Sequence, residues 1–269
     1  MKRLGFSTAM LGAGILFLYL PMFILIFYSF NASKLVTVWA GFSGKWYIGL
    51  FQNQQLMSAA WVSLRIAFYN ACMAVILGTM AAYIMARYRR FKGKTLFASI
   101  TTAPLIMPDV IIGLSLLLMF VSLSDWFGWP AQRGILTIWL AHVTFSTSYV
   151  AVVVGSRLRE VDMSIEEAAM DLGAPPVKTF FLITVPSISS ALVSAWLLAF
   201  TLSLDDLVIA SFVSGPDATT LPMMIFSSVR LGVSPEINAL ATLIILAVAL
   251  ATTIVWWLMR RSNNASYEF

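Results

Sequence analysis

Six apolar stretches, each long enough to cross a lipid bilayer, dominate this sequence. A transmembrane helix needs about 20 predominantly apolar residues. Such stretches lie near Leu11–Phe30, Trp61–Ala86, Leu96–Leu123, Ile135–Gly155, Ser187–Val213 and Ala239–Met259. Because 60% of the 269 residues are hydrophobic and only 11% are charged, a soluble core cannot bury the apolar surface. The sequence therefore predicts an all-α membrane protein with six transmembrane helices.

The basic residues are divided unequally between the two sides of these spans. Of the 17 Lys and Arg, twelve lie on the side of both termini, four lie on the other side, and Arg65 lies within the second span. Since cytoplasmic loops carry the excess of Lys and Arg, we expect both termini in the cytoplasm. The same asymmetry explains the net charge of +5 without a nucleic-acid partner.

A polar segment between the fourth and fifth stretches, Ser164–Pro186, has the pattern of two short helices and is called the elbow below. Ser164 and Glu167 have the spacing of a capping box, which starts a helix. Gly173 suits the left-handed position that ends one. We expect a first helix between these residues.

The second half of the elbow begins with two prolines. Pro175 and Pro176 stop the first helix and favour the start of a second one. That helix is expected to reach about Val185 and to end before Pro186, because a proline inside a helix removes a hydrogen bond. The topology places the elbow in the cytoplasm.

The elbow also carries a spaced motif. Its residues are Glu167, Ala168, Ala169, Gly173, Ile183 and Pro186. This order resembles the cytoplasmic EAA loop of permease subunits of bacterial ATP-binding-cassette importers, with Val185 where Leu is usual. The likeness covers roughly residues 61–260 and extends to the polyamine-transport branch, with the putrescine importers' permeases as the nearest group.

The resemblance implies a fold, a location and a set of partners. The fold is the type I importer permease (MetI-like) core over residues 57–260, preceded by a first helix and external loop (1–56) and followed by a cytoplasmic tail (261–269). The location is the bacterial inner membrane. The partners are a second permease subunit in a heterodimer, cytoplasmic ATP-binding subunits and a periplasmic polyamine-binding protein.

A coupling role for the elbow follows from the same resemblance. The residues expected to transmit ATPase motion are Glu166, Glu167, Ala168, Ala169 and Gly173. The chain itself is then a translocation subunit without a cofactor and not an enzyme. The tripeptide Gly93-Lys94-Thr95 does not make it a nucleotide-binding protein, because the first glycine of a P-loop is absent.

Carboxylates within apolar stretches are costly and indicate function. Asp205 and Asp206 lie in the fifth stretch, and Asp109 follows Pro108 at a position that suits the first residue of a helix. We expect these three to form a negative lining for a small di- or polyamine. Simple helix-end stabilisation is an equal alternative for Asp109.

Two adjacent helical residues point about 100° apart, so Asp205 and Asp206 cannot both face one cavity. One is expected to line the path while the other pairs elsewhere. Thr201 and Ser203 have the spacing to hydrogen-bond Asp205 and Asp206 respectively, and Ser203 is included in the expected path.

Three further residues have more than one interpretation. Trp46 lies in an expected external helix at Lys45–Phe51, where an aromatic belt is the usual explanation and cation capture over its ring is the alternative. His142 is more often a hydrogen-bonded packing residue than a metal ligand. The single cysteine, Cys72, excludes an intrachain disulfide.

The sequence thus predicts an ATP-driven importer permease that moves a polyamine from periplasm to cytoplasm, with putrescine preferred over spermidine. Two alternatives stay open. One is a permease for another small solute, and the other is a proton-coupled secondary transporter.

Overall fold

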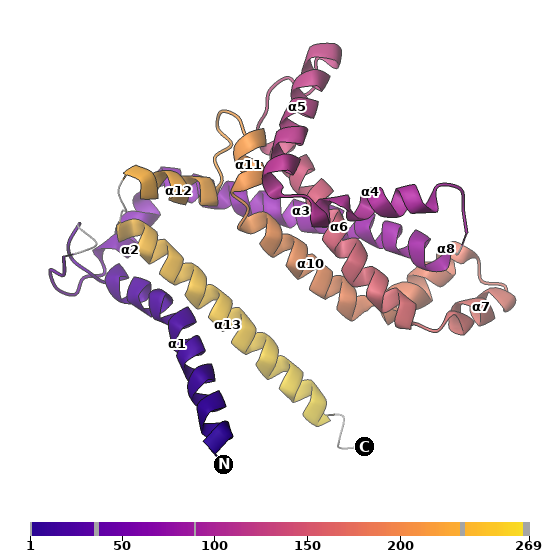
Figure 1. Cartoon of the computed structure of the whole chain (residues 1–269), viewed down its shortest axis with the longest axis horizontal. Coiled ribbons are helices and arrows are strands. Elements are labelled where there is room, and N and C mark those ends of the chain that lie inside the picture. Colours follow the sequence, from indigo (N-terminus) through magenta and orange to yellow (C-terminus); the bar gives the residue numbers. More distant parts are fainter. Residues whose placement is uncertain (1, 35–37, 89, 232–234, 266–269) are drawn as a thin grey trace. The chain divides into compact units, whose positions relative to one another are not determined.

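The computed structural model describes residues 2–34, 38–88, 90–231 and 235–265, and these ranges are helical without a β-sheet (Figure 1). One isolated bridge joins Asn31 and Phe42 within them. The helical elements are α1 (Lys2–Ser29), α2 (Lys45–Gln52), α3 (Gln54–Arg87), α4 (Lys94–Ile106), α5 (Asp109–Phe127), α6 (Ile135–Glu160), α7 (Met163–Asp171), α8 (Pro176–Thr179), the π-helical turn η1 (Phe180–Thr184), α9 (Val185–Ser187), α10 (Ser189–Leu204), α11 (Val208–Val213), α12 (Leu221–Leu231) and α13 (Pro235–Ala265).

Four helices in the described ranges are long and apolar enough to cross a membrane. They are α1 over Gly5–Ser29, α3, α5 and α6. Residues Pro176–Ser187 and α10 count as a fifth span if taken together, with a bend of 75° between them. The predicted all-α membrane architecture is confirmed. The number of six spans and the orientation of the termini stay predictions.

The third predicted span is divided by its second proline. Helix α4 ends at Ile106, and Met107 and Pro108 are extended with ψ of 138° and 139° before α5 begins. A proline pushes the residue before it out of the α-helical region. The break that the position of Asp109 after Pro108 predicts is therefore found, and α5 is a candidate span by itself.

The fifth predicted span is interrupted as well. The expectation of one apolar helix over Ser187–Val213 is wrong, since α10 ends at Leu204 and α11 starts at Val208. The two aspartates lie in this break. The helix expected near Trp46, in contrast, is confirmed as α2, while its external location stays a prediction.

The chain forms two compact units. One consists of residues 1–57 and 225–269, in which α13 contacts α1 and α2. The other, residues 58–224, contains most of α3 and every element from α4 to α11. Both the elbow and the three carboxylates belong to this second unit.

Small side chains allow close packing inside the second unit. Ala71 of α3, Val150 of α6 and Ala195 of α10 are fully buried in one apolar cluster. Asn70 adds a polar link, since its amide donates to the Ser146 hydroxyl at 3.0 Å. Small interfacial residues with a few hydrogen bonds are typical of helix packing in membranes.

Candidate functional site

The first helix of the elbow starts earlier than predicted. Its N-cap is Asp162, whose carboxylate accepts a hydrogen bond from the Ser164 backbone N–H at 2.9 Å. The capping box expected from Ser164 is wrong, because Ser164 already lies inside α7. Hydrogen bonds from Ser164 favour the ionised form of Asp162 and lower the pKa of this exposed carboxyl.

Gly173 ends the first helix as predicted. Its φ is +89°, in the left-handed region, and its N–H donates to Met170 O at 2.9 Å. A Cβ at this position would meet no atom within 4 Å. The requirement for glycine therefore comes from backbone conformation and not from lack of space.

The second half of the elbow runs further than predicted. It begins at Pro176, passes through η1 and ends at Ser187. The expected end before Pro186 is wrong because this proline lies in the first turn of α9, where a missing N–H is tolerated. The π-helical turn before it bonds Val185 N to Phe180 O.

An ion pair holds the elbow to the membrane helices. Arg87, at the end of α3, donates from Nη2 and Nε to the two Glu166 oxygens at 2.6 and 3.0 Å. The side chains are only 8% and 6% exposed. Thr184 of η1 donates to Glu166 Oε1 at 2.9 Å, and Arg87 also reaches Leu158 O of α6 at 3.2 Å. One carboxylate thus joins α3, α7 and η1.

The two adjacent glutamates of the elbow therefore have different environments. Glu166 is turned into the chain, where Arg87 satisfies its charge, whereas Glu167 is exposed. Of this pair, Glu167 is the carboxylate that a basic group of another protein can reach. Ala168 and Gly173 are exposed as well, and Ala169 is half-buried.

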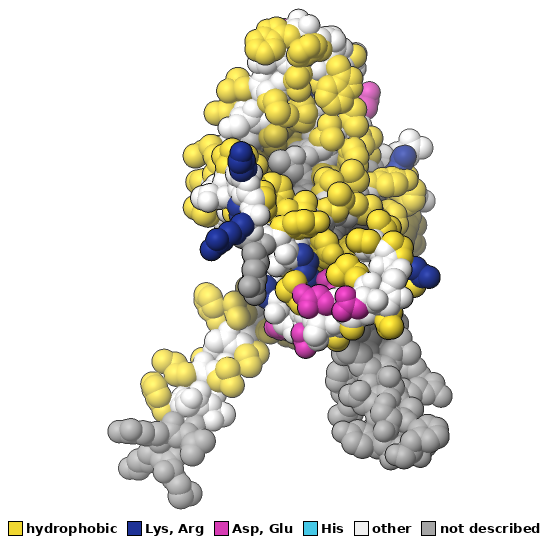
Figure 2. Space-filling view, turned by 90° about the vertical axis from the view of Figure 1, so that its right-hand side faces the viewer, with side chains coloured by type: hydrophobic (Ala, Val, Ile, Leu, Met, Phe, Trp, Pro, Cys, Tyr) yellow, Lys and Arg dark blue, Asp and Glu magenta, His cyan; other side chains and the backbone are white. Residues whose placement is uncertain are grey.

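Large apolar side chains are exposed on the outer surface of the elbow. Figure 2 shows hydrophobic side chains beside acidic ones at this end of the unit. The most exposed are Leu172 (90%), Val177 (68%), Leu182 (64%), Phe181 (62%) and Ile165 (52%). Several large apolar side chains exposed on one short segment indicate a surface for another protein.

The second cluster lies at the break between α10 and α11. His142 of α6 bridges two polar groups, with Nδ1 2.7 Å from Ser203 Oγ and Nε2 3.1 Å from Asp206 Oδ2. In the neutral ring, Nε2–H donates to the carboxylate and Nδ1 accepts from the hydroxyl, which satisfies all three groups. The interpretation of His142 as a hydrogen-bonded packing residue is confirmed. No three metal-ligating side chains come together in the described residues.

Asp206 also caps α11. Its carboxylate accepts hydrogen bonds from the backbone N–H groups of Ile209 at 3.3 Å and Ala210 at 2.7 Å. A negative charge at a helix N-terminus is stabilising. Asp205, in contrast, is the C-cap of α10 and is exposed. The expectation that one aspartate pairs elsewhere agrees with this geometry, and the paired one is Asp206.

The hydroxyl partners predicted for the aspartates are wrong. Thr201 donates to the backbone oxygens of Leu197 and Leu198 at 3.0 and 2.9 Å. Ser203 reaches Asp206 only through the His142 ring. The reason is that i,i+3 and i,i+4 spacing stops applying where α10 ends.

Asp109 occupies the first position of α5, after the N-cap Pro108. It is exposed and has no side-chain partner among the described residues. One turn later, Gly113 lets α11 approach closely, since a Cβ there would lie 2.7 Å from the Phe212 ring. The helix that Asp206 caps thus packs on the first turns of the helix that Asp109 starts.

Trp46 belongs to the other unit. Its indole N–H donates to Asn31 O at 2.6 Å, and Lys45 Nζ lies 4.6 Å from its ring centre. The cation over the ring is therefore one of the chain's own. A role for Trp46 in the path stays a prediction.

Sequence reasoning missed Arg87 and Thr184. Arg87 is one of the twelve basic residues on the side of the termini, and Thr184 lies between the motif residues Ile183 and Pro186. They lie 79 and 18 residues from Glu166, so no local spacing rule connects them. The sequence offers one indication of this contact, because Arg87 is a charge at the end of an apolar stretch and needs a partner.

The family model for the inner-membrane component of binding-protein-dependent transport systems matches residues 74–265. The chain belongs to this family. Its members are components of transport systems, so the chain is a membrane-embedded transport subunit and not an enzyme. The bacterial inner membrane follows as its location, in agreement with the apolar helices.

The chain is also similar to three individual transport proteins. The putrescine transport system permease protein PotI of Escherichia coli K12 is 66% identical, over 93% of this chain and 89% of PotI. The spermidine/putrescine transport system permease protein PotC of Haemophilus influenzae is 41% identical, over 98% of this chain and 100% of PotC. A bacterial ABC transporter that imports alginate has the same fold, with a TM-score of 0.74 at 16% identity over 97% and 96%.

Proposed function

We propose that this chain is the permease subunit through which putrescine enters the cell, driven by ATP hydrolysis in a separate subunit. The observation that carries the proposal is the 66% identity to the putrescine permease protein, against 41% to the spermidine/putrescine one. A diamine is doubly cationic at neutral pH. The carboxylates at the ends of α10 and α5 offer the opposite charge.

Asp205 and Asp109 are the two carboxylates of the proposed path. Both are exposed at helix ends, so neither charge is already neutralised by a side chain of the described residues. Ionisable groups among membrane helices tend to line substrate pathways. Two separated carboxylates also match a cargo with an ammonium group at each end.

Asp206 has a positioning role in this proposal. It fixes the first turn of α11 through its two backbone hydrogen bonds, and His142, itself bonded to Ser203, holds the Asp206 carboxylate in place. The adjacent Asp205 is then presented from a fixed turn. Trp46 would contribute an aromatic face outside this cluster.

The elbow is the proposed connection to the ATPase. Cytoplasmic ATP-binding subunits would cover the apolar patch around Leu172, and Glu167 would meet a basic group there. The buried pair of Arg87 and Glu166 would carry the movement of α7 directly to α3. A second permease subunit completes the path, and a periplasmic polyamine-binding protein delivers the cargo.

Uptake by the reconstituted complex tests the function. Proteoliposomes with all subunits should accumulate labelled putrescine only with ATP and the binding protein, and Asp205→Asn and Asp109→Asn should each lower uptake about tenfold, the equivalent of about 1.4 kcal/mol. Glu160→Gln is a matched control, because this exposed carboxylate pairs only with Arg157. Full uptake by both aspartate variants would contradict the proposed path.

The same preparation separates the alternatives. Accumulation driven by a proton gradient without ATP would support a secondary transporter, for which family membership gives no reason. Equal uptake of an anionic solute would indicate another cargo. Competition by spermidine measures how far the path distinguishes the two polyamines.

Binding of the ATPase tests the elbow. Leu172→Asp changes a side chain that is 90% exposed, so the chain should fold normally while co-purification with the ATPase is lost. Asp171→Asn, next to it and also exposed, should retain the complex. Unchanged co-purification of Leu172→Asp would mean that the patch binds something else.

A further inference from the structure

An arginine on the outer face of a membrane helix is not used by the proposed path. Arg65 of α3 is exposed and has no salt-bridge or hydrogen-bond partner among the described residues. A charged side chain within a transmembrane segment is costly unless it pairs or reaches the membrane interface. Arg65 therefore needs either a partner from outside the described residues or access to the membrane interface.

Its depth favours the membrane interface. Helix α3 has 34 residues, which corresponds to about 51 Å, whereas the hydrocarbon core is about 30 Å thick. Arg65 lies about 16 Å along the helix. With the core centred on α3, this is about 6 Å inside the boundary. A long side chain covers such a distance by extending toward the headgroups.

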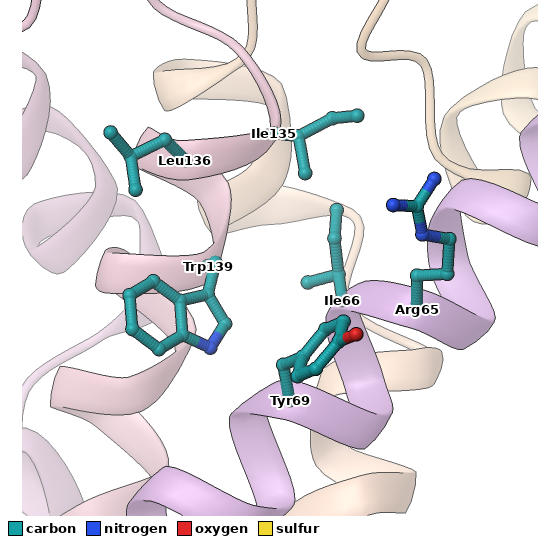
Figure 3. A pocket seen from close by; sticks show the side chains of 6 residues that line it. All are labelled: Arg65, Ile66, Tyr69, Ile135, Leu136 and Trp139. Carbon is teal, nitrogen blue, oxygen red and sulfur yellow. The ribbon is translucent and has the colours of Figure 1, made fainter.

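Two apolar hollows lie on either side of this position. One, of about 480 Å³, is lined by residues of α3 and α6 (Figure 3), namely Arg65, Ile66, Tyr69, Ile135, Leu136 and Trp139. The other, of about 370 Å³, is lined by Trp61, Leu64, Arg65, Phe68, Tyr69 and Phe200. Arg65 and Tyr69 belong to both hollows and so form the ridge between them.

The ridge presents hydrogen-bond donors. Arg65 and Tyr69 are one turn apart, and the Tyr69 hydroxyl is turned toward the Arg65 side (Figure 3). Trp139 adds a buried indole N–H that has no partner in the described structure. It is turned toward α3 in the same view. A guanidinium with neighbouring O–H and N–H donors is suited to a phosphate group.

We propose that this ridge binds the phosphate of an anionic membrane phospholipid, with one acyl chain in each hollow. A phospholipid has the required form, since it combines one phosphate with two apolar chains. Arg65 pairs with the phosphate, Tyr69 donates to it, and the aromatic rings of Trp61 and Trp139 cover the upper part of the chains. This site goes beyond the transport of putrescine and is independent of it.

Native mass spectrometry of the intact complex measures the retained lipid directly. Wild-type protein in nanodiscs with phosphatidylglycerol should keep a bound phospholipid after transfer to detergent. Arg65→Gln should lower this retention about tenfold, because it removes the charge-assisted hydrogen bond to the phosphate. Arg65→Lys should retain part of it. Arg157→Gln removes an equal charge from an exposed helix-end pair and should change nothing.

Two further arms identify the ligand. Leu136→Trp fills one hollow while leaving the guanidinium in place, and it should also lower retention, which a charge effect alone does not explain. Glycerophosphate, which has the phosphate without acyl chains, should not raise the melting temperature of the complex. If glycerophosphate raises the melting temperature as much as the phospholipid does, the ligand of this site is a free phosphate ester and not a lipid.

A photo-reactive residue at position 136 distinguishes lipid from protein. We expect cross-linking to phospholipid in the assembled complex. Cross-linking to the second permease instead, or equal lipid retention by wild type and Arg65→Gln, would overturn the proposal.

Discussion

The chain has two pairs of adjacent acidic residues, one in the elbow and one at the α10–α11 break. In the two pairs, different partners stabilise the carboxylate that lies inside the protein. In each pair one carboxylate is inside and one is exposed. Glu166 pairs with Arg87 and the Thr184 hydroxyl, whereas Asp206 pairs with His142, which in turn contacts the Ser203 hydroxyl. The exposed neighbours are Glu167 and Asp205.

The difference lies in the basic partner. An arginine keeps its charge at every physiological pH and holds a carboxylate through two parallel hydrogen bonds. The imidazole of His142 offers the Asp206 carboxylate a single ring nitrogen, and backbone N–H groups supply the other hydrogen bonds. The elbow is thus held by one buried ion pair, while the break between α10 and α11 is held by several separate hydrogen bonds.

The largest effect is expected from breaking the stronger pair. Glu166→Ala leaves the buried Arg87 without its carboxylate partner, which costs about 3 to 5 kcal/mol. We expect a lower melting temperature in detergent and rapid proteolysis within residues 163–187. Glu167→Ala, its exposed neighbour, should melt within about 1 °C of wild type because exposed charges contribute little.

A double substitution then separates charge from contact. Arg87→Met with Glu166→Leu replaces the buried pair by apolar residues of similar size, and such replacements are often neutral or stabilising. The double variant should regain thermal stability. If Glu166→Ala alone melts like wild type, the ion pair does not hold the elbow.

The weaker cluster should show a smaller loss of stability. Asp206→Asn removes a charged acceptor from two backbone N–H groups, which costs about 1.5 to 3 kcal/mol. Asp205→Asn should leave the melting temperature unchanged and lower uptake. Asp206→Asn should therefore lower the melting temperature, and Asp205→Asn should lower uptake alone. If the two variants behave identically in both assays, Asp205 and Asp206 do not have different roles.

Gly173 comes next in size. Gly173→Ala forces a side chain into the left-handed region, at a cost of about 1 to 2 kcal/mol, without a clash. Hydrogen exchange of the elbow amides should accelerate while the rest of the second unit is unchanged. Gly173→Trp should in addition uncouple ATP hydrolysis from uptake, whereas coupled transport by that variant would argue against docking at this position.

The smallest effect is a local dependence on pH. The pKa of Asp162 is lower in the folded chain than in the unfolded one because Ser164 hydrogen-bonds the ionised form. Its contribution is therefore fully present above the unfolded pKa and is lost as pH falls through the lower folded pKa. The protection of the Ser164 amide, taken relative to its intrinsic exchange rate at each pH, should fall in that acidic range, and Asp162→Asn should weaken this dependence. If the protection of the Ser164 amide does not depend on pH, the Asp162 carboxylate does not cap α7.

Patterns within a few residues of one another were predictable. The left-handed Gly173 and the helix break before Asp109 follow from local backbone chemistry and appear in the structure, and side-chain hydrophobicity predicted the candidate spans α1, α3, α5 and α6. The predicted start of α7 was wrong by two residues, because two neighbouring residues can each serve as its N-cap. Asp162 and Ser164 both suit an N-cap, and the choice depends on where α7 meets the rest of the unit.

The sequence by itself determined that this chain lies in a membrane and carries an elbow between two spans, because hydrophobicity, glycine and proline act locally. Only the tertiary structure decided which acid of each pair is buried. Arg87 lies 79 residues from Glu166, and His142 lies 64 residues from Asp206. Adjacent side chains on a helix point in different directions, and the one that faces a distant basic residue becomes the structural one.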